Sequence, residues 1–113
     1  MAKVIISKAG PLPIEVTIPD PGDAPVTFII AGSCYTNTQT GKIGMNLEIN
    51  GAAVAQSTIW ANNLNEHLAT VTTGYTTNLD PTQADQGTHK ISLTNITGTV
   101  TDTNDWFTVI MNV

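Results

Sequence analysis

Hydrophobic and polar residues alternate along much of this chain, most clearly on the two sides of the dipeptide Asn50-Gly51. Before it, Ile43–Ile49 places an apolar residue at every second position, which is the period of a strand with one buried face. Asn and Gly tolerate the positive φ angles of a two-residue type I′ turn. The sequence therefore predicts a β-hairpin over Ile43–Trp60. Its expected pairs are Ile49 with Ala52, Leu47 with Val54, Met45 with Gln56, and Ile43 with Thr58.

Other short segments show a similar pattern, and turn-forming residues separate them. The further expected strands are Lys3–Ser7, Ile14–Ile18, Pro25–Ala31, His67–Tyr75, Thr88–Thr94 and Trp106–Val113. Apolar residues occupy both faces of Pro25–Ala31, so we expect this strand to be buried on both sides. With the hairpin these segments make about eight short strands and no convincing helix. The pattern favours an all-β protein, an antiparallel β-sandwich of jelly-roll type, with residues 1–113 as a single domain.

Charge and composition narrow the classes of partner. The chain has a formal net charge of −5, and its four basic residues are all lysines. Because phosphate groups are bound by clustered Lys and Arg, we expect no nucleic acid partner and no anionic membrane partner. No apolar run approaches the roughly 18–20 residues of a membrane span, so no membrane insertion is expected. No signal peptide is visible, which indicates a cytoplasmic protein or one exported without a conventional signal.

No catalytic motif stands out in the sequence. A nucleophilic triad needs Ser, Cys or Thr beside a His that a carboxylate orients. His67 and His89 fall on expected strands, where a packed or rim side chain is the commoner role. Cys34, the single cysteine, falls in an expected loop without an obvious activating neighbour, and it cannot form an intramolecular disulfide. We therefore expect no enzymatic activity.

Asn, Asp and Thr residues gather in three expected loops, Thr36–Thr40, Ala61–Glu66 and Asn95–Asp105. Their amide and carboxylate groups suit sugar hydroxyls, and a nearby tryptophan can stack on the apolar face of a pyranose. The candidate sugar-binding residues are Asn62, Asn65, Trp60, Asn104, Asp105 and Trp106. The last loop also offers the oxygen atoms that calcium prefers, although Asp and Asn are equally ordinary turn residues.

The segment Gly98–Met111, GTVTDTNDWFTVIM, resembles the C-terminal part of the small soluble calcium-dependent galactose lectins of Gram-negative bacteria. Pro21-Gly22-Asp23, followed by an apolar strand and a loop with Tyr35, is a weaker similarity to the first half of that family. The resemblance implies sugar binding with calcium as cofactor. The calcium ligands it implies are Asn95, the Thr99 carbonyl, Asp102, Thr103 or Asn104, and the Tyr35 carbonyl. This chain has an amide at Asn95, where the family has an acid.

A second resemblance concerns the order of elements. A strand, a hairpin with the sequence ING and a final strand with the sequence FTV are similar to trimeric jelly rolls of the tumour-necrosis-factor kind. This similarity implies an assembly module of the phage or surface adhesin type. A trimer needs an apolar outer face, which Trp60 and Trp106 are able to supply unless they lie in the core. Few charged side chains lie on the expected strands to oppose pairing of their edges with another chain. We therefore expect a homo-oligomer.

Two functions therefore remain open. The first is a lectin-like, carbohydrate-binding protein that recognises neutral sugars through its Asn- and Asp-rich loops, with or without calcium. The second is a structural or assembly module that has no small-molecule ligand. A lectin needs Trp60 or Trp106 exposed beside clustered Asn and Asp residues, whereas an assembly module needs them at subunit contacts.

Overall fold

A computed structural model describes residues 1–113, and almost all of its regular structure is β-strand. The strands are β1 (Ala2–Ala9), β2 (Ile14–Pro19), β3 (Val26–Cys34), β4 (Gly41–Ile49), β5 (Ala52–Ala61), β6 (Leu68–Ala69), β7 (Thr73–Thr77), β8 (Thr88–Asn95) and β9 (Trp106–Asn112). The one helical segment is a 3₁₀ turn at Pro81–Gln83. The structure contains no helix with the length and apolarity that a membrane crossing requires.

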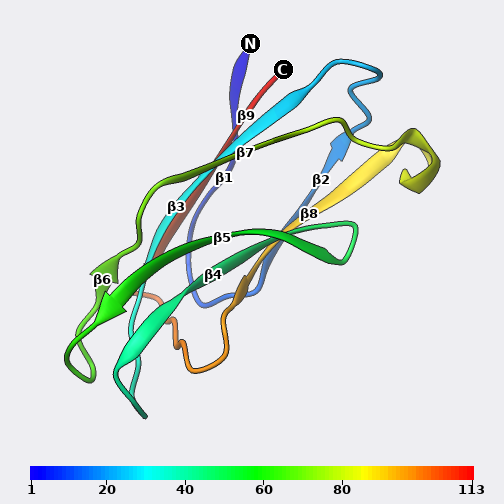
Figure 1. The fold of residues 1–113 in the computed structure, drawn as a ribbon. Helices are drawn as coiled ribbons and strands as arrows, with labels where there is room; N and C mark the ends of the chain where they lie inside the picture. The colour runs from blue at the N-terminus through cyan, green and yellow to red at the C-terminus, as the bar shows by residue number, and fades with distance from the viewer.

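The strands form two antiparallel sheets that face each other (Figure 1). The first sheet has the order β1-β9-β3-β6, with β7 also pairing with β3, and the second has the order β2-β8-β4-β5. Because β6 and β7 pair with the same edge of β3, they act as one interrupted strand. With these two counted together, the strand order is that of a jelly roll. The expected antiparallel β-sandwich is confirmed.

The core lies between the sheets and is built from the inward-facing residues of both. In β3, Val26, Phe28 and Ile30 are fully buried and pack with side chains from β4, β8 and β9. Ile29, between them, is exposed on the outer face of the first sheet. The prediction that this strand is buried on both sides is therefore wrong. The reason is architectural, because a two-layer sandwich leaves one face of each antiparallel sheet open.

The hairpin tip is confirmed, but its predicted register is wrong beyond the first pair. Asn50 and Gly51 have φ angles of 51° and 87°, and Ile49 pairs with Ala52. A register shift between Leu47 and Glu48 then moves the partners along β5 by one residue. The observed pairs are Leu47 with Ala55, Met45 with Ser57, and Ile43 with Ile59.

This β-bulge has a physical reason. A one-residue slip exchanges the two faces of a strand. In the observed register Ser57 and Ala61 are buried, whereas Gln56 and Trp60 are exposed on the outer face. The unshifted register would have turned Gln56 and Trp60 towards the core.

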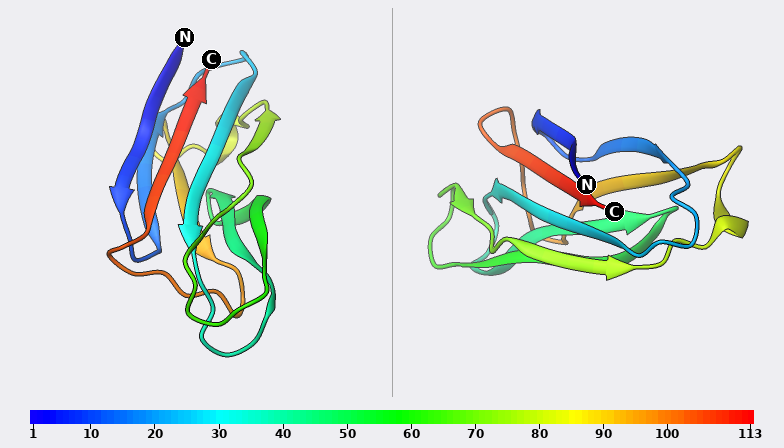
Figure 2. Two further views of the ribbon diagram at one scale, coloured as in Figure 1. Left: turned by 90° about the vertical axis from the view of Figure 1, so that its left-hand side faces the viewer. Right: turned by 90° about the horizontal axis from the view of Figure 1, so that it is seen from above.

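The expected strand His67–Tyr75 is interrupted in the structure. Thr70 is buried, and its backbone N–H donates to the Gly32 carbonyl of β3 at 2.8 Å. The next N–H, of Val71, donates instead to the Thr58 carbonyl of β5 at 2.9 Å. After β6 the chain thus leaves the first sheet and forms one hydrogen bond with β5 of the second sheet. It then returns to pair with β3 as β7 (Figure 2). Alternation of side chains does not reveal such a crossing.

Candidate functional site

Three loops meet at the end of the sandwich that lies away from the chain termini (Figure 1), and we call this region the three-loop end. It comprises residues 35–40, 62–67 and 96–105. The first and third loops are joined by a bridge in which Tyr35 and Val100 exchange backbone hydrogen bonds of 3.0 and 2.7 Å. The second loop is tied to the first because the Asn65 N–H donates to the Thr36 carbonyl at 2.7 Å. The polar loops that the sequence singles out are therefore neighbours in space.

Asp105 is the centre of this region, and it is fully buried. One carboxylate oxygen, Oδ1, accepts from the Ser33 hydroxyl at 2.8 Å and from His67 Nδ1 at 2.7 Å. The other oxygen, Oδ2, accepts from the backbone N–H of Asp102 at 2.9 Å. A buried carboxylate is tolerated only when its oxygens have partners, and each oxygen of Asp105 has at least one. Asp105 thus fixes the imidazole and the third loop in one arrangement.

Close packing against the third loop explains why a glycine is found at the turn after β1. The Gly10 N–H donates to the Asp105 carbonyl at 2.8 Å. A Cβ at Gly10 would lie 2.6 Å from the Asp102 carbonyl oxygen and 3.0 Å from the Phe107 ring. The backbone is therefore packed too closely around the third loop to admit a side chain here.

His67 stands on the outer side of Asp105 and faces a second carboxylate. Its Nε2 lies 3.8 Å from Asp102 Oδ2, and the side chains of His67 and Asp102 are 35% and 38% exposed. The Tyr35 ring lies over the imidazole with 4.3 Å between ring centroids. His67, Asp102 and Tyr35 together form the accessible polar part of the three-loop end, which we call the outer triad.

The electrostatics of the outer triad follow from its carboxylates. The hydrogen bond to Asp105 is the largest influence on the pKa of His67 and raises it; desolvation opposes this effect, and the charges of Asp105 and Asp102 add to it, so the pKa is raised overall. Partial desolvation raises the pKa of Tyr35, and the two aspartates raise it further. The site therefore favours a protonated imidazole and a neutral phenol beside a carboxylate.

The arrangement resembles part of a catalytic triad, but the Ser33 hydroxyl in it donates to Asp105 and not to His67. Asp105 orients His67 through Nδ1, yet Nε2 faces the Asp102 carboxylate. Cys34, at the end of β3, is fully buried, and desolvation followed by the charge of Asp105 raises its pKa to about 12. Because the thiolate is the reactive form, this thiol is inert at neutral pH.

The candidate sugar-binding residues separate into several places. Asn62, Asn65 and Asn104 are exposed at the three-loop end, and Asp105 lies beneath the surface. Trp60 and Trp106 are 64% and 55% exposed, so neither lies in the core. They belong to different sheets and lie on opposite outer faces of the sandwich. The two indole rings therefore cannot stack on the same sugar.

Most of the residues predicted as calcium ligands take part in hydrogen bonds within the protein, although the bond at Thr99 uses its hydroxyl and not the predicted carbonyl. The Tyr35 carbonyl accepts from the Val100 N–H, the Thr99 hydroxyl accepts from the Gly44 N–H at 3.0 Å, and Asn95 accepts from the Thr101 hydroxyl at 3.2 Å. The Asn104 N–H donates to Asp102 Oδ1 at 2.8 Å.

The group of side chains with metal-binding potential is a different one. His67, Asp102 and Asp105 offer ligand atoms that lie within 4.8 Å of one another. Only Asp102 belongs both to this group and to the predicted calcium ligands. Imidazole and carboxylate ligands together suit zinc and similar ions better than calcium, which prefers oxygen ligands alone.

His67 is the member that sequence reasoning missed. It was expected on a strand, but it precedes β6 in a loop, 38 residues away from Asp105 along the chain. The only local signal was its position at the end of a polar loop. The other histidine, His89, is buried on β8, so its expected role as a packed side chain is confirmed.

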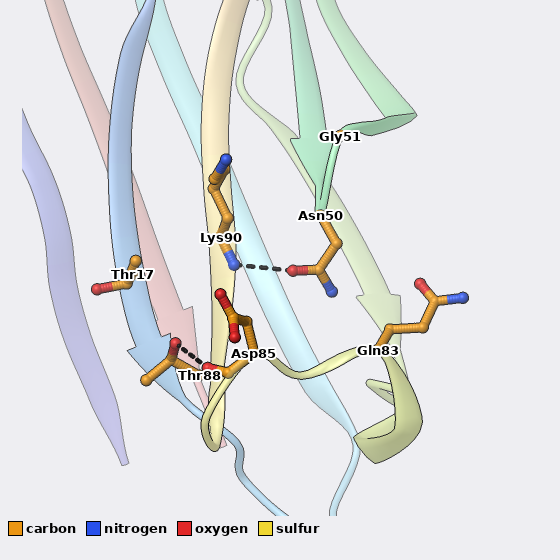
Figure 3. Close-up of a pocket in the computed structure, with 7 residues that line it drawn as sticks. All are labelled: Thr17, Asn50, Gly51, Gln83, Asp85, Thr88 and Lys90. Carbon is orange, nitrogen blue, oxygen red and sulfur yellow. Dashed lines mark hydrogen bonds between the residues drawn. The ribbon is translucent and has the colours of Figure 1, made fainter.

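A hollow of about 280 Å³ lies at the opposite end, beside the hairpin tip (Figure 3). Its lining contains no hydrophobic side chain. The Asn50 side chain in its wall accepts from the Lys90 N–H at 2.9 Å and contacts the buried His89 ring at 2.9 Å. His89 in turn contacts Asp20 at 3.0 Å. These bonds fix the hairpin tip, and we assign this network a structural role.

The sequence matches no protein-family model and has no significant similarity to any curated protein. A jelly-roll fold supports many unrelated functions, so function has to be inferred from the site.

Proposed function

We propose that this protein is a lectin-like carbohydrate-binding protein that recognises neutral sugars at its three-loop end, without catalytic turnover. The observation that supports the proposal is the outer triad of His67, Asp102 and Tyr35, held in place by the buried Asp105. Such an arrangement offers a carboxylate acceptor, an imidazole and a phenol within one small surface. Because the groups are ordered before binding, little conformational entropy is lost when a ligand arrives.

Asp102 is the principal contact in this proposal. Its Oδ1 is oriented by the Asn104 N–H at 2.8 Å, and its partly exposed Oδ2 faces His67. A carboxylate fixed in this way accepts hydrogen bonds from sugar hydroxyls, and bonds to a charged acceptor are stronger than neutral ones. Asn104 and Asn65 stand exposed nearby, on the third and second loops, and supply amide donors and acceptors.

The absence of lysine and arginine from the three-loop end favours neutral ligands. The four lysines are at positions 3, 8, 42 and 90, none of them in these loops. The imidazole of His67 already lies between the carboxylates of Asp105 and Asp102, so a phosphorylated or sulfated sugar would bring further negative charge to a site with an excess of carboxylates. Neutral hydroxylated sugars avoid this repulsion.

A glycan array with the parent protein and Asp102→Asn tests the proposal. We expect binding to a neutral glycan that is lost in the variant, because the change keeps the shape of the side chain and removes its charge. Asp85→Asn, an exposed carboxylate at the other end, is the matched control and is expected to bind as the parent does. Arrays with calcium and with a chelator decide whether calcium assists. An array without any hit, or equal binding by parent and Asp102→Asn, would contradict the proposal.

A further inference from the structure

The two outer faces of the sandwich differ in charge. On the second sheet the outward positions include Glu15, Lys42, Glu48 and Lys90, as expected for a face in water. On the first sheet, cross-strand partners show which residues share the outer face, because directly paired residues point to the same side.

Strand β9 lies between β1 and β3 in the first sheet, and its outward residues are Trp106, Thr108, Ile110 and Asn112. Their partners on β1 are Ala9, Ser7, Val4 and Ala2. Their partners on β3 are Ala31, Ile29 and Thr27. None of these residues is charged, and we call this surface the uncharged face.

An apolar row crosses the middle of the uncharged face. Val4 pairs with Ile110, and Ile110 pairs with Ile29, so the three side chains are adjacent across β1, β9 and β3. Val4 is 55% exposed and Ile29 is exposed as well. Figure 2, left, shows these three strands side by side. A contiguous apolar row on an open sheet face is typical of an interaction surface.

We propose that the uncharged face binds a second copy of this chain, face to face, to form a weak homodimer. The charge distribution supports this occupant. The chain carries a net charge of −5, so most surfaces of two copies repel each other. When two uncharged faces meet, no charged side chain is desolvated and no like charges are opposed.

Association through the β1 edge of the sheet is less favourable than association through its face. The edge strand β1 carries Lys3 and Lys8, both exposed. Lysines on an edge strand oppose pairing with another strand. The face of β1, by contrast, presents Val4 and small residues.

The small size of the face indicates a weak contact between the two copies. Three strands about 4.8 Å apart and about 20 Å long cover a flat area on the order of 300 Å² per copy. Protruding side chains add to this area. A standard interface buries about 800 Å² per partner, so the contact lies at the weak end. We therefore expect a weak dimer that dissociates on dilution.

Trp106 supplies a spectroscopic reporter of the dimer. It lies on the uncharged face, and its indole N–H donates to Ser7 Oγ at 3.3 Å, so it lies over β1. Trp60 is on the opposite face and stays in water. On association the emission of Trp106 is expected to shift to shorter wavelength, and this shift should be missing in Trp106→Phe.

Sedimentation equilibrium from about 5 to 500 µM tests the proposal, with Ile29→Lys as the disrupting variant. Its side chain is exposed, so the new lysine is expected to leave the fold intact, which circular dichroism checks. Val71→Lys changes an exposed apolar residue outside the face and serves as the matched control. We expect the parent and Val71→Lys to approach dimer mass at high concentration, while Ile29→Lys shows at least about tenfold weaker association.

Two outcomes would overturn the proposal. A parent protein that stays monomeric up to about 500 µM has no dimer of this kind, and the face then belongs to a different partner. Equal association of the parent and Ile29→Lys places the contact on another surface. Neither outcome bears on sugar binding, because Asp102 lies at the three-loop end and not on the uncharged face.

Discussion

Replacing Asp105 by asparagine tests whether the buried carboxylate organises the three-loop end. The Ser33 hydroxyl, the His67 imidazole and the Asp102 backbone N–H all donate to it. Asparagine keeps one acceptor oxygen and introduces an NH₂ group, which is a donor. Because Asp105 is fully buried, water cannot supply the missing acceptor. The new NH₂ group therefore faces at least one former donor, which has to reorient, change its protonation state or lose its partner.

The expected loss of stability follows from these contacts. A hydrogen bond to a charged group contributes about 1.5–3 kcal/mol, and a buried donor without a partner costs about 1–3 kcal/mol. Removing one member of such a network typically costs about 3–5 kcal/mol. Since domains of this kind unfold with about 5–15 kcal/mol, Asp105→Asn should lose a large part of the free energy of unfolding. The melting temperature should fall by roughly 10–20 °C.

Urea denaturation followed by tryptophan fluorescence measures this loss. The control is Asp85→Asn, because the Asp85 side chain is exposed and forms no hydrogen bond in the structure. Its free energy of unfolding is expected to stay within about 0.5 kcal/mol of the parent value. If Asp105→Asn unfolds within about 1 kcal/mol of the parent, the buried carboxylate does not organise this end.

Two further predictions concern pH and the hairpin. The pKa of His67 is raised above its ordinary value of 6.5, so the folded state binds this proton more tightly than the unfolded state does. Thermal stability should therefore decline as pH rises from about 6 through the folded-state pKa of His67, and scanning calorimetry should show a smaller decline in His67→Gln than in the parent. At the hairpin tip, Gly51 has a φ angle of 87°, so Gly51→Ala should cost roughly 1–2 kcal/mol in urea denaturation; an unchanged midpoint would mean that the turn relaxes without strain.

Much of the fold could be predicted because its signals are local. The alternation over Ile43–Ile49 and the Asn50-Gly51 dipeptide contain the information for the hairpin within a few residues. The bulge after Leu47 could not be predicted in this way, because it depends on which face of β5 meets the core. The same holds for the break after Ala69, which depends on contacts with two different sheets.

The candidate site was predicted less completely, for a related reason. The loop with Asp102 and Asp105 was recognised from its composition. The separate roles of these two aspartates, one partly exposed and one buried, follow only from packing. His67 joins Asp105 across 38 residues, and no local pattern marks this contact.

Calorimetric titration with the strongest hit of the glycan array is the most direct test of sugar binding at the three-loop end. The parent protein and Asp102→Asn are titrated with the same neutral glycan at the same pH. Loss of a hydrogen bond to a charged acceptor, at about 1.5–3 kcal/mol, predicts an affinity at least about tenfold weaker for the variant, with an unchanged circular dichroism spectrum. Equal affinities for the parent and Asp102→Asn would contradict the assignment of the binding site to the outer triad.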